Sequence, residues 1–144
     1  MIELLYFASQ IQCGTGGEFL DIQVNVYQNQ ELVETMVVED RVLLPVDSVS
    51  DLTFEYSVIN NDNDTSCSSL AAPSELVLAP DDELPNLAGF DQQDSVISLL
   101  SGLNEYQELF LVELGTTDTA SSAFDMQDVT LRIDNNPVIS LFAD

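Results

Sequence analysis

The chain has 144 residues, of which 26 are Asp or Glu, two are Arg and none is Lys, His or Trp, so its formal net charge is −24. This charge disfavours binding to nucleic acid or anionic lipid, and it favours metal cations and basic proteins as partners. The missing side chains argue against enzymatic activity, because His and Lys supply most of the general bases and activated nucleophiles that work near neutral pH.

The composition is that of a folded domain, since 45% of the residues are hydrophobic and the carboxylates are spread along the whole chain. We therefore expect a single domain over 1–144 rather than an acidic disordered tail. A charge this unbalanced opposes compaction, and cations can compensate for it either as concentrated salt or as specifically bound divalent ions.

Short strands dominate the pattern. Alternating or continuous apolar residues predict strands, in chain order, at 2–11, 22–27, 31–39, 41–46, 52–59, 74–79, 109–114, 129–134 and 137–142. A hairpin loop is expected at 28–30, and one short helix is expected at 94–103. About nine strands with at most one short helix predict an all-β fold, namely an antiparallel β-sandwich of the jelly-roll or immunoglobulin-like type.

The closing segment 123–131, AFDMQDVTL, has acidic residues followed by an alternating apolar strand. In this it resembles the final strand of jelly-roll surface modules and carbohydrate-binding modules. The resemblance implies a β-sandwich surface module. The Cys…Trp…Cys signature of immunoglobulin domains is missing, because the chain has no Trp.

Three acidic segments offer oxygen ligands of the kind that calcium prefers. The first is NNDNDT at 60–65, where Asn60, Asp62 and Asp64 alternate, but an EF-hand is excluded because Ala71 stands at the twelfth position. The second segment is Asp81-Asp82-Glu83, followed by Asp91 and Asp94, and the third contains Asp118, Asp125 and Asp128. The candidate metal ligands are Asn60, Asp62, Asp64, Asp81, Asp82 and Asp118. The alternative is that these segments are solvated turns that only add solubility.

Cys13 and Cys67 allow one disulfide, and the alternative is two buried free thiols. Closing a loop of about 55 residues stabilises a fold by about 4 kcal/mol in the chain-entropy model. Each of the two arginines is expected to form an ion pair within the chain. Arg132 has Asp134 two residues away on the same strand face. The alternative role for either arginine is a contact with an acidic partner copy.

These observations favour a non-enzymatic acidic β-sandwich module that acts in assembly or adhesion, with cations as partners and calcium as a candidate cofactor. Self-association or a basic protein partner is expected, whereas nucleic acid is not. No run approaches 18 apolar residues, so no membrane insertion is expected.

One alternative is a carbohydrate-binding module, with or without calcium, for which Gln23 and Asn25 are among the available amides. A second alternative is an acidic mimic of nucleic acid that occupies a basic protein. The expected location is extracellular or on the surface of a particle, and the alternative is the cytoplasm of a high-salt organism.

Overall fold

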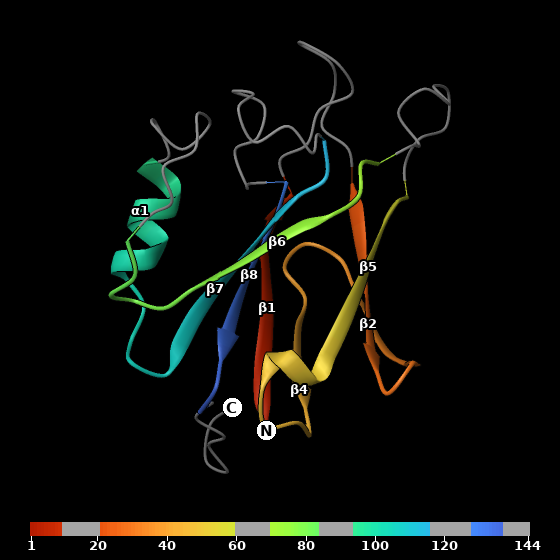
Figure 1. The fold of residues 1–144 in the computed structure, drawn as a ribbon, viewed down its shortest axis with the longest axis horizontal. Helices are drawn as coiled ribbons and strands as arrows, with labels where there is room; N and C mark the ends of the chain where they lie inside the picture. The colour runs from red at the N-terminus through yellow and green to blue at the C-terminus, as the bar shows by residue number, and fades with distance from the viewer. Residues whose placement is uncertain (10–20, 60–69, 84–93, 116–127, 137–144) are drawn as a thin grey trace.

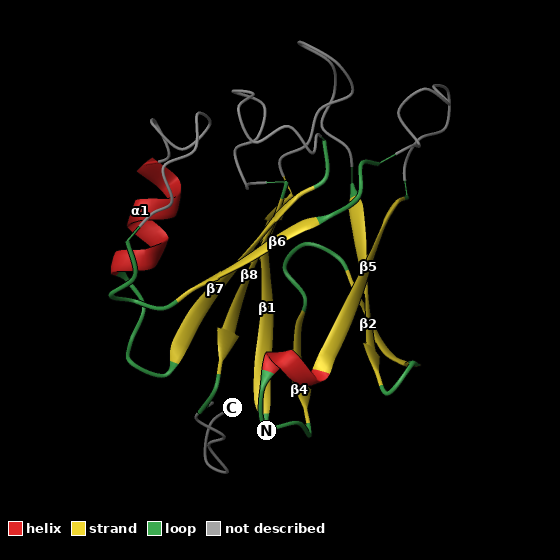
Figure 2. Ribbon diagram, in the orientation of Figure 1, coloured by secondary structure: helices red, strands yellow, loops and turns green. Residues whose placement is uncertain are grey.

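The computed structural model describes residues 1–9, 21–59, 70–83, 94–115 and 128–136. Most of this part of the chain is β-structure (Figure 2). The strands are β1 (Ile2–Ser9), β2 (Ile22–Gln28), β3 (Glu31–Met36), β4 (Arg41–Leu44), β5 (Leu52–Val58), β6 (Ser74–Leu78), β7 (Gln107–Glu113) and β8 (Val129–Asp134). The helices are the 3-10 helix η1 (Val49–Asp51) and the α-helix α1 (Asp94–Ser101).

The eight strands form two antiparallel sheets (Figure 1). The larger sheet has the order β4-β1-β8-β7-β6, and the smaller sheet has the order β3-β2-β5. The chain crosses between the sheets four times, because β1, β4 and β6 to β8 lie in the larger sheet while β2, β3 and β5 lie in the smaller one. The expectation of a mostly β fold with one short helix is confirmed for the described residues. The ninth expected strand, 137–142, lies outside them.

The inner faces of the two sheets share one hydrophobic core. Alternation along β1 places every second residue in this core, namely Ile2, Leu4 and Tyr6, each of which has no exposed surface. The rings of Phe54 in the smaller sheet and Phe110 in the larger sheet lie 4.8 Å apart between their centroids, tilted by 46°. This contact joins the two sheets in the same core.

Two tyrosines also join the sheets through their hydroxyl groups. Tyr6 of β1 donates a hydrogen bond to the carbonyl oxygen of Ile22 on β2 over 2.9 Å. Tyr56 of β5 donates one to a carboxylate oxygen of Glu75 on β6 over 2.5 Å. Burial raises the pKa of Tyr56 well above its usual range, and the hydrogen bond and the charge of Glu75 raise it further. Both hydroxyls therefore hold their protons firmly in the folded state.

The outer face of the larger sheet is covered by α1 over β6 and β7 (Figure 1). Val96 and Leu100 of the helix pack on Leu109 and Leu111 of β7 and on Leu78 of β6. This second cluster explains why β7 is apolar on both faces, since one face meets the sheet-to-sheet core and the other meets α1. No helix in the described part of the chain is long and apolar enough to cross a bilayer.

Two turns set the ends of β3. Asn29 and Gln30 both have positive φ, 53° and 66°, as a two-residue hairpin turn requires. The hairpin expected at 28–30 is therefore present, but its loop is 29–30, because Gln28 still pairs with Glu31 at the end of β2. The strand expected at 31–39 is shorter than predicted, because β3 ends at Met36. There Asp40 folds back on Val37, whose backbone N–H donates to the Asp40 carboxylate over 2.9 Å. Glu39, with φ 81°, completes this turn.

Candidate functional site

The predicted calcium ligands fall into two groups. Asn60, Asp62, Asp64 and Asp118 lie outside the described residues, and so do Cys13 and Cys67 of the predicted disulfide. Asp81 and Asp82 are described, and both are exposed in the turn that follows β6. One carboxylate oxygen of Asp82 already accepts a hydrogen bond from the backbone N–H of Ala79 over 2.8 Å.

Within the described ranges, no three acidic or cysteine side chains are arranged to hold a metal ion. The calcium site therefore stays a prediction, and it depends on residues outside these ranges.

Asp128 of the third acidic segment is 5% exposed, and it is buried at the end of β7 together with Glu113, which is 1% exposed. The backbone N–H of Gly115 donates to both of them, over 2.8 Å to Glu113 and 2.9 Å to Asp128. Asp128 also accepts a hydrogen bond from the backbone N–H of Leu114 over 2.7 Å. Backbone donors are the partners that a buried carboxylate needs, so these two side chains stabilise the chain where β7 ends.

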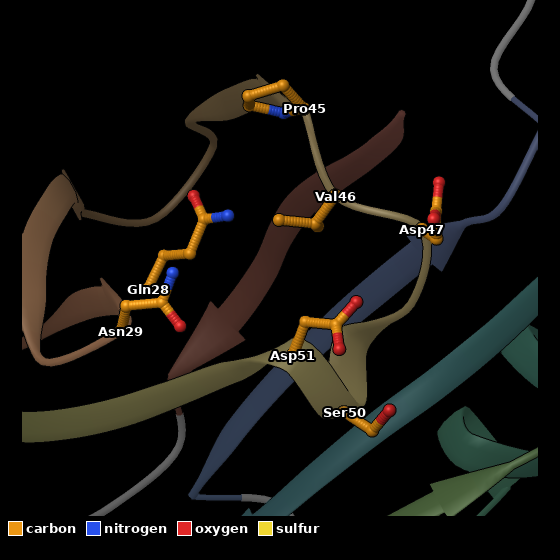
Figure 3. Close-up of a pocket in the computed structure, with 7 residues that line it drawn as sticks. All are labelled: Gln28, Asn29, Pro45, Val46, Asp47, Ser50 and Asp51. Atoms are coloured by element: carbon orange, nitrogen blue, oxygen red, sulfur yellow. The ribbon is translucent and has the colours of Figure 1, made fainter.

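A polar depression opens between the β2–β3 turn and the segment that joins β4 to β5 (Figure 3). Its volume is about 530 Å³. The lining residues are Gln28, Asn29, Pro45, Val46, Asp47, Ser50 and Asp51. The amides come from the turn, while the carboxylates and the hydroxyl come from the opposite segment. Ser48 holds that segment by accepting a hydrogen bond from the backbone N–H of Ser50 at the start of η1. The depression offers hydrogen-bonding groups and little apolar surface.

Both arginines approach a single carboxylate on the outer face of the larger sheet. Glu3 of β1 lies 3.8 Å from Arg41 Nε on β4 and 3.7 Å from an Arg132 terminal nitrogen on β8. The Arg132 guanidinium also lies over the ring of Phe7, 5.7 Å from its centroid. The expected ion pairs are thus confirmed, but the partner is Glu3. Asp134, the neighbour that the spacing suggested, instead accepts hydrogen bonds from Gln107 and from the backbone of Asn136.

The edge strand β3 carries an exposed apolar strip. Leu32 and Val33 of β3 are 50% and 38% exposed, and Val37 and Val38 just beyond it are 38% and 39% exposed. Among the strands that the structure describes, β3 pairs with β2 alone. We call residues 31–38 the β3 edge. Within the described residues, the side of Glu31–Met36 that faces away from β2 pairs with no strand, and exposed apolar side chains accompany it, a combination that favours pairing with another strand.

The outer face of the smaller sheet is polar instead. Asn25 of β2 stands in register with Thr35 of β3 and Glu55 of β5. Gln23 and Tyr27 lie two residues to either side of Asn25 on the same face of β2, while the alternate residues of β2 are buried. Hydrogen bonds connect all five of these side chains.

Comparison of the chain with protein-family models, with curated proteins and with solved structures gives no match. Function is therefore inferred from the surfaces described above.

The sequence pointed to only part of these surfaces. Gln23 and Asn25 were recognised as amides on a strand, but their partners Thr35 and Glu55 were not, because strand pairing brings them together from distant segments. The exposed end of β3 was also missed, since Val37 and Val38 continue an apolar run that indicates a longer strand. The register between strands brings these residues together, and no local sequence motif indicates that register.

Proposed function

We propose that the chain is a non-enzymatic acidic β-sandwich module that acts in assembly or adhesion, outside a cell or on the surface of a particle, with its charge compensated by cations. The observation that carries this proposal is the β3 edge. We infer that copies associate by placing their β3 edges side by side, because main-chain hydrogen bonds and apolar contacts both become available there.

The charge of the chain determines when this association takes place. Two copies that each carry a charge of −24 repel one another, and Glu31 and Glu34 lie on the associating strand itself. Both arginines already approach Glu3 on the other sheet, so they do not neutralise this edge. The compensating cations therefore come from the solvent. We expect association to strengthen with salt or with divalent ions.

The pairing of the strands disfavours the immunoglobulin-like alternative, so we propose the jelly-roll type for the sandwich, with the ninth strand at 137–142. In the immunoglobulin order the first strand pairs with the second. Here β1 pairs with β4 and with β8, while β2 pairs with β3 and β5. The resemblance of 123–131 to jelly-roll surface modules agrees with this choice, since β8 includes the last three residues of that segment.

Light scattering during size-exclusion chromatography tests the proposal. The wild type, a double variant Val33→Asn/Val38→Asn and the control Ile97→Asn are compared from low salt to about 1 M NaCl, where the screening length falls to about 3 Å. Ile97 is a matched control, because it is 49% exposed on α1, away from the β3 edge.

We expect the wild type and the control to associate at high salt, while the double variant stays monomeric. Equal association of all three proteins, or a monomeric wild type under every condition, contradicts the proposal. A basic protein is the alternative partner for the same edge. It predicts binding to a Lys-rich protein that weakens, rather than strengthens, as salt is added.

A further inference from the structure

The outer face of the smaller sheet carries polar side chains that take no part in strand pairing at the β3 edge. We propose that this face, formed by Gln23, Asn25, Tyr27, Thr35 and Glu55, binds a neutral polysaccharide chain. We call these five residues the polar face. The proposal is independent of self-association, because it concerns side chains on the surface of the sheet rather than the backbone along its edge.

The side chains of the polar face are already held in position. Asn25 Oδ1 accepts hydrogen bonds from Gln23 Nε2 over 3.2 Å and from Thr35 Oγ1 over 3.0 Å. Asn25 Nδ2 donates to Glu55 Oε1 over 3.3 Å, and the Tyr27 hydroxyl donates to the same oxygen over 3.4 Å. A ligand that binds here orders few side chains, so less affinity is lost to conformational entropy.

The network leaves groups that suit sugar hydroxyls. Within the described residues, Glu55 Oε2, Gln23 Oε1 and the second N–H of the Asn25 amide make no hydrogen bond. The two oxygens are hydrogen-bond acceptors and the Asn25 N–H is a donor, and all three belong to planar amide or carboxylate groups. Neighbouring hydroxyls of a sugar both donate and accept, so they match such a pattern. Because three strands contribute to one surface, the face suits an extended chain rather than a single small molecule.

An apolar surface lies beside these polar groups. Tyr27 is half-buried on the face and stands in register with Leu32, which is 50% exposed. The C–H face of a sugar ring is apolar and packs on aromatic and aliphatic side chains, while its hydroxyls reach the polar atoms around them. The chain has no Trp, so Tyr27 supplies the aromatic surface on which a sugar ring stacks.

The charge of the protein selects a neutral polymer. Glu55 is the one carboxylate of the polar face, and neither arginine lies on this sheet. A net charge of −24 repels acidic polysaccharides, whereas uncharged hydroxyl groups meet no such barrier. Glu55 already accepts two hydrogen bonds and is the single carboxylate of the polar face, whereas a metal site needs several oxygen ligands. The polar face therefore does not favour metal binding.

Affinity electrophoresis of the full chain, with isothermal titration of any polymer that retards it, tests this proposal. The probes are xylan, mixed-linkage β-glucan, mannan and dextran, with alginate as the acidic polymer and with EDTA throughout. The variants Tyr27→Ala and Asn25→Ala remove the stacking surface and the centre of the network. Tyr106→Ala is the matched control, because Tyr106 is 47% exposed in the turn before β7. Thermal melts establish that each variant is folded.

We expect at least one neutral polymer to bind while alginate does not. Each of the two variants on the polar face should weaken binding by at least about tenfold, or about 1.4 kcal/mol, and Tyr106→Ala should leave it unchanged. The proposal is overturned if none of the four neutral polymers binds. It is equally overturned if the folded Tyr27→Ala and Asn25→Ala variants bind as tightly as the wild type, or if alginate binds as well as the neutral polymers.

Discussion

Replacing Tyr6 by Phe removes one buried hydroxyl that connects the two sheets. The ring stays in the core, so the main loss near neutral pH is the hydrogen bond to the Ile22 carbonyl, which spans 2.9 Å. We expect the free energy of unfolding to fall by about 1–2 kcal/mol, because the bond is lost and a buried carbonyl loses a partner. The more specific effect of this substitution is on the stability at alkaline pH.

Burial raises the pKa of Tyr6 from its ordinary value of 10 to about 12. A hydrogen bond with Ser9 lowers it, and the charge of Asp21 raises it, by smaller amounts. The unfolded chain releases this proton first, so the contribution of Tyr6 to stability is complete below about pH 10 and is lost as the pH rises to about 12. At 1.36 kcal/mol for each pKa unit, the full loss is about 3 kcal/mol. Tyr56, whose pKa burial also raises, contributes in the same direction.

Urea denaturation at constant NaCl, followed by circular dichroism between about pH 9 and about pH 12, measures this loss. The window is favourable because the chain has no Lys or His. Each of the two tyrosines contributes up to about 1.4 kcal/mol per pH unit. The slope of the Tyr6→Phe variant should therefore be about half that of the wild type, while Tyr106→Phe should match the wild type. Identical slopes for Tyr6→Phe and the wild type would refute this account of the core.

Three further outcomes are expected. Replacing Glu3 by Gln leaves both arginines without their carboxylate, so it lowers the melting temperature. Replacing the exposed Glu105 by Gln leaves the melting temperature unchanged. Equal changes in the melting temperatures of the two variants contradict the assignment of the ion pairs. Replacing Asp128 by Asn weakens the contacts to the backbone after β7 and costs about 1–3 kcal/mol in urea denaturation; an unchanged midpoint argues against this role. Adding NaCl raises the melting temperature of the wild type through screening; a melting temperature independent of salt shows that the carboxylates repel one another too weakly to matter.

Much of the β-structure could be predicted from the sequence, because a half-buried strand alternates with a period of two. Ile22, Val24 and Val26 all point to the core, as their spacing indicated. The helix at 94–103 was also expected, and α1 covers Asp94–Ser101 of that range. Local pattern was sufficient in these segments, because burial on one face is a local property of the strand or helix.

The end of β3 and the partners of each strand could not be predicted in this way. Val37 and Val38 continue the apolar run, and only the turn closed by Asp40 ends the strand. The spacing in sequence suggested Asp134 as the ion-pair partner of Arg132. The partner is Glu3 instead, because β8 lies beside β1. The polar face has the same origin, since its side chains come from three strands. Long-range pairing therefore determines the candidate surfaces, and a period-two pattern does not encode it.

The central claim is that copies of this chain join at the β3 edge once cations screen their charge. Amide hydrogen exchange, compared between the low-salt monomer and the high-salt assembly, tests it most directly. The account predicts that assembly slows exchange at backbone amides within Glu31–Met36, while Ser74–Leu78 of β6, an edge strand of the other sheet, exchanges as it does in the monomer. Unchanged exchange in β3, or new protection in β6 alone, would contradict the claim.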